Sequence, residues 1–379
     1  MTEILYKVLK KIYYDYLPNS LRKYYGPEVD ILYARLHRLY SMVCDLSMPV
    51  TCMIDQTSHV SFKHTIVVAS IDTDSCDILN RSILPETTTT NRVSLGKRYL
   101  WNVSKLNKGK TNTLLIEADR CFFSLLKAKG LIAIPTRVMF TLDITMPTED
   151  ILKRYKKRNW SNYQRIVKCD CTYEVVRDRD MVELFYYRMY LPYITSRHRE
   201  AAITLSFEYI NNLMQYGELL LIKKGNEYIG GILINTSYSP PLVAFLGILD
   251  AREDYFKIGL SPIMYNSVIC WAKEKGHTTL DFGHCMPFLD DSLLQFKRQW
   301  GMTVRRSPRA ERTLYLSLGR VNASLKQYLI NHPLICEDHG HLKGLLSLDR
   351  NATHTDRAVE ALKKKYTMPG LNEFSVILL

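Results

Sequence analysis

The sequence lacks the long apolar run that a transmembrane helix requires. Its longest apolar stretches, such as residues 219–222, have the length of a strand, whereas a helix that spans a bilayer needs about 20 apolar residues. The first residues also lack a basic stretch followed by an apolar stretch, which is the pattern of a secretory signal. These absences predict a cytoplasmic protein with no membrane span.

The sequence also has little that indicates a disulfide framework, a metal site or a phosphate-binding loop. The nine cysteines are an odd number and are scattered, which favours reduced thiols in the cytosol. The string Cys-Glu-Asp-His-Gly-His at 336–341 resembles a metal site, but no second cluster with zinc spacing accompanies it. The triplet Gly-Lys-Thr at 109–111 resembles the end of a P-loop, yet Ser104 stands where that motif needs glycine. We therefore expect no metal site and no P-loop.

Positive charge, by contrast, is in surplus. Lysine and arginine number 51 against 38 acidic residues, which gives a net charge of +13. A positive field of this size attracts a phosphorylated cofactor, a nucleic acid or a membrane surface, although it can also serve only to keep a protein soluble. The length of 379 residues and the hydrophobic fraction of 46% predict a folded protein with more than one domain.

Two basic segments have helical periodicity. Residues 3–16 place five apolar side chains on one face, and such a helix either packs on a domain core or contacts a membrane surface. Residues 148–168 predict a second helix, whose basic side chains surround most of its circumference and alternate with Trp160 and Tyr163. A helix of this composition is either simply exposed to solvent or contacts the phosphates of RNA.

The order of predicted elements divides the chain into four parts. Residues 1–147 predict an N-terminal α+β domain, 148–171 a basic linking helix, and 321–379 a C-terminal helical appendage. Between them, residues 172–320 predict an α/β (α+β) domain with a mixed, mostly antiparallel sheet and one parallel crossover around a helix at 259–275. The other strands and helices expected in this domain lie at 172–176, 179–190, 204–216, 218–224, 228–235, 242–249, 278–282, 289–300 and 313–318.

The start of the crossover helix is a predicted anion site. A strand that leads through a glycine-containing turn into a helix leaves backbone N–H groups free, and the helix dipole adds positive charge there. Ser261 is a suitable N-cap and Pro262 a suitable first-turn residue, although a turn of this kind also occurs with no ligand. The predicted cradle for a pyrophosphate consists of Lys257, Ile258, Gly259, Leu260 and Ser261.

Four blocks of sequence stand out by their order and spacing. They are a strand and basic helix at 140–165, Glu-Tyr-Ile-Gly-Gly-Ile-Leu-Ile at 227–234, the crossover segment 257–276, and a block at 280–301 that contains Asp-Phe-Gly and Phe-Lys. Together they resemble the GNAT superfamily of acyltransferases, most closely its Fem-type branch. The resemblance implies a GNAT-like fold for about residues 138–320. It also implies that the N-terminal half is a second, divergent GNAT-like unit.

The resemblance further implies transfer of an acyl group from acyl-CoA, in particular acetyl-CoA, to the primary amine of a small molecule or amino sugar. The donor thioester would lie between the strands that end near Asp250 and Gly283, where the amine attacks directly. The amine must lose a proton and the departing thiolate must gain one. The candidate catalytic residues are Asp250, Glu253, Tyr265 and His284, and Lys297 is a candidate for contacting a phosphate or a substrate carboxylate.

Each of these roles has a structural alternative. The two carboxylates can be solvated loop residues, and Tyr265 can be packed in the core. Because the phosphate turn contains a single glycine, an aminoacyl-tRNA donor and a catalytically silent GNAT-like binding module stay open beside acyl-CoA. The basic helix at 148–168 favours the tRNA alternative. The sequence leaves the oligomeric state undetermined.

Overall fold

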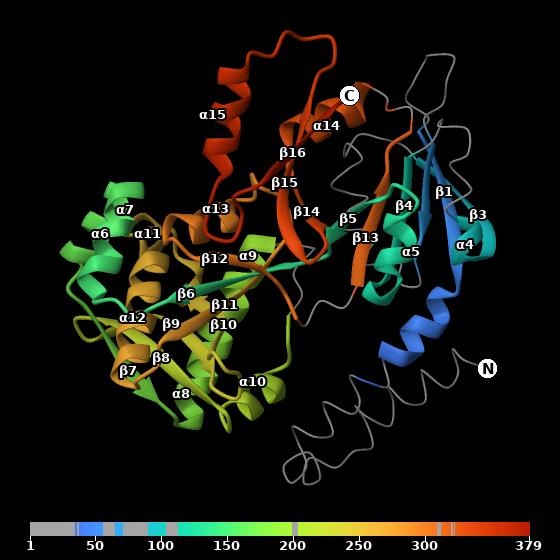
Figure 1. Ribbon diagram of the computed structural model, residues 1–379. Helices are drawn as coiled ribbons and strands as arrows, with labels where there is room; N and C mark the ends of the chain where they lie inside the picture. The colour runs from blue at the N-terminus through green and yellow to red at the C-terminus, as the bar shows by residue number, and fades with distance from the viewer. Residues whose placement is uncertain are drawn as a thin grey trace.

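In the computed structural model, the described residues form two mostly antiparallel sheets, one of nine strands and one of seven, with helices packed against them (Figure 1). The structure describes residues 35, 38–55, 65–70, 90–103, 113–198, 204–308, 312–319, 321 and 323–379. The helix expected at 3–16 and the triplet at 109–111 lie outside these residues. No described helix is both long enough and apolar enough to cross a membrane.

The nine-stranded sheet has the order β16-β15-β14-β5-β13-β4-β2-β1-β3. Its strands are β1 (Ser47–Asp55), β2 (Thr65–Ala69), β3 (Thr90–Tyr99), β4 (Thr113–Asp119), β5 (Ile132–Pro135), β13 (Arg312–Ser317), β14 (Leu334–Asp338), β15 (His341–Leu348) and β16 (Phe374–Leu378). The helices of this half are α4 (Leu100–Val103), η3 (Arg120–Phe122), α5 (Phe123–Lys127), α14 (Ala323–Asn331) and α15 (Asp356–Tyr366).

The seven-stranded sheet has the order β12-β6-β11-β10-β9-β8-β7. Its strands are β6 (Val138–Asp143), β7 (Cys171–Val176), β8 (Gly217–Lys224), β9 (Glu227–Asn235), β10 (Leu242–Ile248), β11 (Thr279–Cys285) and β12 (Thr303–Arg306). The helical elements of this half are α6 (Thr148–Arg158), α7 (Trp160–Lys168), α8 (Arg179–Leu184), η4 (Phe185–Tyr190), α9 (Leu191–His198), α10 (Phe207–Leu213), η6 (Leu249–Ala251), α11 (Glu253–Lys257), α12 (Leu260–Glu274) and α13 (Ser292–Gln299). The expected mixed α/β (α+β) class is confirmed.

The sheets do not follow the boundaries drawn from the sequence. Strand β6, which those boundaries assign to the N-terminal part, pairs with β11 and β12 in the seven-stranded sheet. Strand β13, which they assign to the domain at 172–320, pairs with β4 and β5 in the nine-stranded sheet. The C-terminal segment is not a helical appendage, because β14, β15 and β16 complete the same sheet. Strand pairing is a long-range contact, so local periodicity does not assign it.

Three glycines allow helices to pack closely on both faces of the seven-stranded sheet. A Cβ on Gly230 would lie 2.5 Å from Met264 Cε of α12, and a Cβ on Gly231 would lie 2.7 Å from Phe185 Cδ2 on the opposite face. A Cβ on Gly247 would lie 2.6 Å from backbone atoms of the π-helical turn η4. The sheet is therefore buried between α12 and the segment α8–α9, as Figure 1 shows.

Replacement of Gly247 by alanine is expected to lower the free energy of unfolding by about 1–3 kcal/mol, because the new Cβ meets helix backbone that cannot rotate away. Urea unfolding followed by circular dichroism measures the change. Gly344→Ala in β15 is the control, since its Cβ would meet the side chain of Phe374, which is half-buried and can turn aside. Equal losses in both variants would show that backbone contact is not the cause.

Candidate functional site

The parallel strands β10 and β11 pair at one register position and then diverge. Leu242 lies opposite Asp281, which confirms the predicted parallel crossover through α12. Each strand contains a β-bulge directly after this pair, around Ala244 in β10 and between Asp281 and His284 in β11. A bulge bends its strand, so two bulges at the same level separate the carboxyl ends. The separated ends lead to Asp250 and His284, two of the residues predicted to act.

The Asp-Phe-Gly motif builds the bulge of β11. The Oδ1 atom of Asp281 accepts a hydrogen bond from the Gly283 N–H at 2.7 Å. Gly283 has a φ of 71°, in the left-handed region that glycine adopts without steric cost. The motif thus redirects the chain immediately before His284.

Lys297 of α13 holds the same strand end. Its Nζ donates to the carbonyl of Gly283 at 3.4 Å and to that of His284 at 3.3 Å. The side chain is 2% exposed and packs over the ring of Phe140, and burial lowers the pKa of its ammonium group. The structure therefore places the Lys297 ammonium against backbone carbonyls inside the protein, whereas the sequence suggested contact with a phosphate or a carboxylate.

His284 is half-buried at the end of β11, and its ring has a defined partner. The Nε2 atom lies 2.6 Å from the hydroxyl of Ser307, which follows β12 and is fully buried. Sequence reasoning missed Ser307, because a serine after a short strand has no motif around it. The pair brings together two segments 23 positions apart in the chain.

Asp250 lies in η6 after β10 and is engaged by an arginine. Arg188 of η4 donates from Nε to Oδ1 at 2.7 Å and from Nη2 to Oδ2 at 2.5 Å. These hydrogen bonds hold the pKa of the Asp250 carboxyl below its usual value. A carboxylate with a lowered pKa is a weaker base, so this geometry suits Asp250 to fixing the turn after β10 better than to accepting a proton.

Glu253 and Tyr265 have contrasting environments. Glu253 is almost fully exposed in α11 and lies 3.6 Å from Lys257 one turn away. Tyr265 is buried on α12, with its ring centroid 4.7 Å from that of Phe282 and 5.0 Å from that of Phe296. Burial raises the pKa of the Tyr265 phenol far above its usual value, which makes it a poor proton donor.

Aromatic side chains and a cation from α9 lie near Tyr265. The ring of Tyr193 stacks on Phe256 of α11 at 5.9 Å, and the Arg197 guanidinium lies over the Tyr193 ring at 5.9 Å. Both α9 residues interact electrostatically with Tyr265. This surface combines apolar area with an exposed cation, and sequence reasoning did not identify it.

The turn before α12 offers N–H donors from fewer residues than the predicted cradle contains. Gly259, with a φ of 80°, is the N-cap of α12, so Ser261 lies inside the helix and does not cap it. The N–H groups of Ile258 and Gly259 donate to carbonyls of α11, which leaves those of Leu260 and Ser261 as first-turn donors. The side chain of Arg165 packs on Gly259, since a Cβ there would lie 2.6 Å from its Cδ. Arg165 thus brings a second cation to the turn that follows Lys257.

The predicted basic helix at 148–168 is two helices. The chain breaks at Asn159, whose side chain caps α7 by accepting a hydrogen bond from the Asn162 N–H at 3.0 Å. Trp160 is 52% exposed and its ring stacks near Tyr163 at 5.7 Å. The two helices also carry exposed cations, namely Lys153, Arg154, Lys157, Arg158, Arg165 and Lys168.

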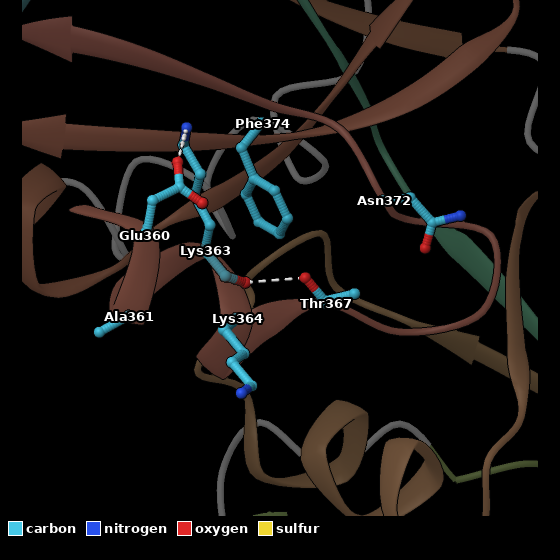
Figure 2. A pocket seen from close by; sticks show the side chains of 7 residues that line it. All are labelled: Glu360, Ala361, Lys363, Lys364, Thr367, Asn372 and Phe374. Carbon is cyan, nitrogen blue, oxygen red and sulfur yellow. Dashed lines mark hydrogen bonds and ion pairs between the residues drawn. The ribbon is translucent and has the colours of Figure 1, made fainter. Parts of the chain in front are cut away.

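Two cavities lie apart from the carboxyl ends of β10 and β11. A cavity of about 590 Å³ lies at α15 and is lined by Glu360, Lys363, Lys364, Phe374 and their neighbours (Figure 2). A second cavity, of about 500 Å³, is lined in part by Leu316, Lys326 and Arg350. The linings of these two cavities include none of the residues predicted to act.

The prediction of reduced thiols is wrong for two cysteines. Cys169 and Cys171 form a disulfide, and their Cα atoms are 5.2 Å apart, a normal distance for such a bridge. Six of the described cysteines are free. In the string at 336–341, Cys336 is buried on β14 and Asp338 forms ion pairs with Lys127 and Lys343. Residues 336–341 form the end of the β-hairpin in which β14 pairs with β15.

These elements place a parallel crossover beside diverging strand ends in a mostly antiparallel sheet, the arrangement that the resemblance to the GNAT superfamily predicts. No protein-family model and no curated protein matches the chain. Solved structures similar to it include FemX, with 16% identity over 70% of this chain and 83% of that one, and a TM-score of 0.39. L-PGS from Bacillus licheniformis has 13% identity over 72% and 82% of the two chains, and a TM-score of 0.35. A GCN5-related N-acetyltransferase-like protein from Streptococcus suis has 11% identity over 71% and 84%, and a TM-score of 0.29.

Proposed function

We propose that the chain is an N-acyltransferase that moves an acyl group from acyl-CoA, in particular acetyl-CoA, to a primary amine of a small molecule or amino sugar. The observation that carries the proposal is the divergence of β10 and β11 after one paired position, with His284 at the end of one strand. Strands that separate leave backbone N–H groups that can hold a donor carbonyl. Holding both reactants there makes direct attack effectively unimolecular.

His284 is the proposed base. The amine nitrogen attacks the thioester carbon, and the imidazole accepts the proton that the amine loses. As the C–N bond forms, the C–S bond breaks, and the imidazolium returns the proton to the departing thiolate. Histidine suits both steps because its ordinary pKa lies near neutrality. Asp250 and Glu253 are less suitable bases, because the first is paired with Arg188 and the second is solvated.

The donor pyrophosphate is proposed to bind at the start of α12. The first-turn N–H groups of Leu260 and Ser261 and the dipole of this 15-residue helix favour an anion there. Lys257 and Arg165 add positive charge at the same turn. The aromatic surface at Tyr193 is proposed to contact the acyl group or the acceptor.

An aminoacyl-tRNA donor is the second candidate function. It is favoured by the stacked rings of the exposed Trp160 and the half-buried Tyr163, and by the exposed cations that α6 and α7 carry. Bases stack on exposed aromatic rings, and phosphates require neutralisation by basic side chains. A catalytically silent binding module is the third candidate function. A cytoplasmic location is part of the proposal and is supported by the six free thiols.

Acetyl-CoA at about 100 times its dissociation constant is expected to stabilise the protein by about 2.7 kcal/mol, which a thermal shift assay detects. Lys257→Glu is expected to weaken this shift, because it reverses a charge at the proposed pyrophosphate site. Lys224→Glu, at the exposed β8–β9 hairpin, is the control and is expected to keep the full shift.

Equal shifts in the two variants would refute the placement of the pyrophosphate. Salt-sensitive tRNA binding without an acetyl-CoA shift would favour the second function. Absence of both responses would favour the binding module.

A further inference from the structure

Strand β16 is an edge strand without a charged residue. It ends the nine-stranded sheet, and among the described strands it pairs only with β15 (Figure 1). The three other edge strands of the two sheets, β3, β7 and β12, each contain at least one arginine, lysine or glutamate, whereas β16 reads Phe-Ser-Val-Ile-Leu. Charged side chains and proline on an edge strand oppose the addition of a further strand. Because β16 contains neither, its edge can accept one.

The backbone hydrogen bonds show which residues of β16 face outward. The Glu373 carbonyl accepts from the Gly344 N–H at 2.8 Å, and the Leu379 N–H donates to the Leu348 carbonyl at 2.9 Å. Successive residues of a strand direct their N–H and C=O groups to alternate sides, so the odd-numbered residues of β16 bond to β15. The residues whose N–H and C=O groups point away from the sheet are therefore Phe374, Val376 and Leu378.

The edge is apolar along its length and carries opposite charges at its two ends. Val376 is 39% exposed and Leu378 is 51% exposed. The exposed Glu373 directly precedes β16. At the other end lies the exposed Arg350, whose Nη2 donates to the Leu378 carbonyl at 3.3 Å. An acidic and a basic side chain thus flank the row of outward backbone groups.

We propose that this edge pairs with the same edge of a second copy of the chain, as two antiparallel β16 strands related by a two-fold axis at Val376. In this register Val376 lies opposite Val376 of the second copy, and Phe374 lies opposite its Leu378. The outward N–H and C=O groups bond across the interface, and each copy contributes the same surface.

The charges at the strand ends are the reason to infer a second copy and not an unrelated strand. In an antiparallel pair, the start of one strand lies beside the end of the other, so Glu373 of each copy meets Arg350 of the other. The Phe374 N–H of the second copy takes the Leu378 carbonyl, and Arg350 turns from this carbonyl to the carboxylate. The edge is therefore complementary to itself in charge as well as in hydrogen bonding.

The interface is small, and we expect a weak dimer. Each copy contributes a strand of five residues, which buries less surface than a permanent dimer interface does. Association in the micromolar range is therefore expected. At about 0.15 M salt the Debye length is about 8 Å, so repulsion between the distant positive charges of the two copies is largely screened.

Sedimentation equilibrium of the full chain at about 1 to 100 µM protein tests the proposal. We expect an equilibrium between monomer and dimer in the native protein. Val376→Lys is expected to raise the dissociation constant by about tenfold or more, because the two-fold axis places the two new ammonium groups opposite each other. An equimolar mixture of Val376→Lys and Val376→Glu is expected to associate again, since opposite charges then meet at the axis.

Val175→Lys is the matched control, because Val175 is also 39% exposed and lies on β7, an edge strand of the other sheet. It is expected to keep the native dissociation constant. A native protein that stays monomeric over the whole concentration range would overturn the proposal, as would equal weakening by Val175→Lys. A mixture of the two Val376 variants that fails to associate, with each variant folded by circular dichroism, would refute the pairing at Val376.

Discussion

Replacement of Arg312 by methionine is expected to lower the free energy of unfolding by about 3–5 kcal/mol. Arg312 of β13 donates to both carboxylate oxygens of Asp45, at 3.0 and 3.2 Å, and to Glu117 Oε1 at 2.9 Å. Asp45 is fully buried and Glu117 is 2% exposed. Burial raises the pKa of Asp45 above its usual value even with the arginine present. Without Arg312, two buried carboxylates lose their counter-ion.

Chemical unfolding followed by circular dichroism measures this loss. Arg305→Met on β12 is the matched control, because Arg305 is exposed and forms no ion pair with any residue that the structure describes. It is expected to change stability by less than about 0.5 kcal/mol. Adding Asp45→Asn to Arg312→Met is expected to recover part of the loss, since it removes an unpaired buried charge. Equal effects of the two single variants would contradict the role assigned to Arg312.

Replacement of His284 by glutamine is expected to lower kcat about 10²- to 10⁴-fold, the contribution typical of a general base. Glutamine keeps an N–H donor that can reach Ser307, so the fold and the support of this strand end are retained. The glutamine amide cannot accept a proton near neutral pH. Binding of acetyl-CoA is therefore expected to stay close to that of the native protein.

Release of the CoA thiol in the presence of primary amines measures the rate, and the thermal shift measures donor binding. His341→Gln, at the exposed first residue of β15, is the control and is expected to keep full activity. The acid limb of the dependence of kcat/KM on pH is expected to disappear in His284→Gln, because that limb reports protonation of the base. If His284→Gln kept both the native kcat and the acid limb of the pH profile, another residue would be the base.

Much of the seven-stranded half could be predicted from the sequence. Periodicity and glycine-containing turns indicate most of its strands and helices to within a few residues, and the order of elements predicts the parallel crossover around α12. These features are local, since each depends on the residues of one segment and its caps. The same reasoning placed Asp250 and His284 at the ends of the strands that diverge.

Features that depend on pairing between distant segments were decided by the tertiary structure. Whether β6 or β13 joins a given sheet depends on partners more than 100 positions away, such as Leu280 opposite Leu142 and Leu316 opposite Leu115. The strands after residue 320 were also missed: β14 and β15 pair with each other as a hairpin, and the hairpin joins the sheet where Glu337 lies opposite Ala133 of β5.

The site follows the same division. From the sequence it could be predicted that His284 lies near the carboxyl end of a strand, that glycine stands in the turn before α12, and that the chain carries a large positive charge. The folded structure was needed to show that Arg188 forms an ion pair with Asp250, that the Lys297 ammonium points inward to backbone carbonyls, and that the Ser307 hydroxyl contacts the imidazole. The physical reason is that hydrogen bonds and burial depend on side chains brought together from different segments. The local sequence pattern predicts that a residue lies at the end of a strand. Its hydrogen bonds and its burial depend on residues that folding brings from other segments.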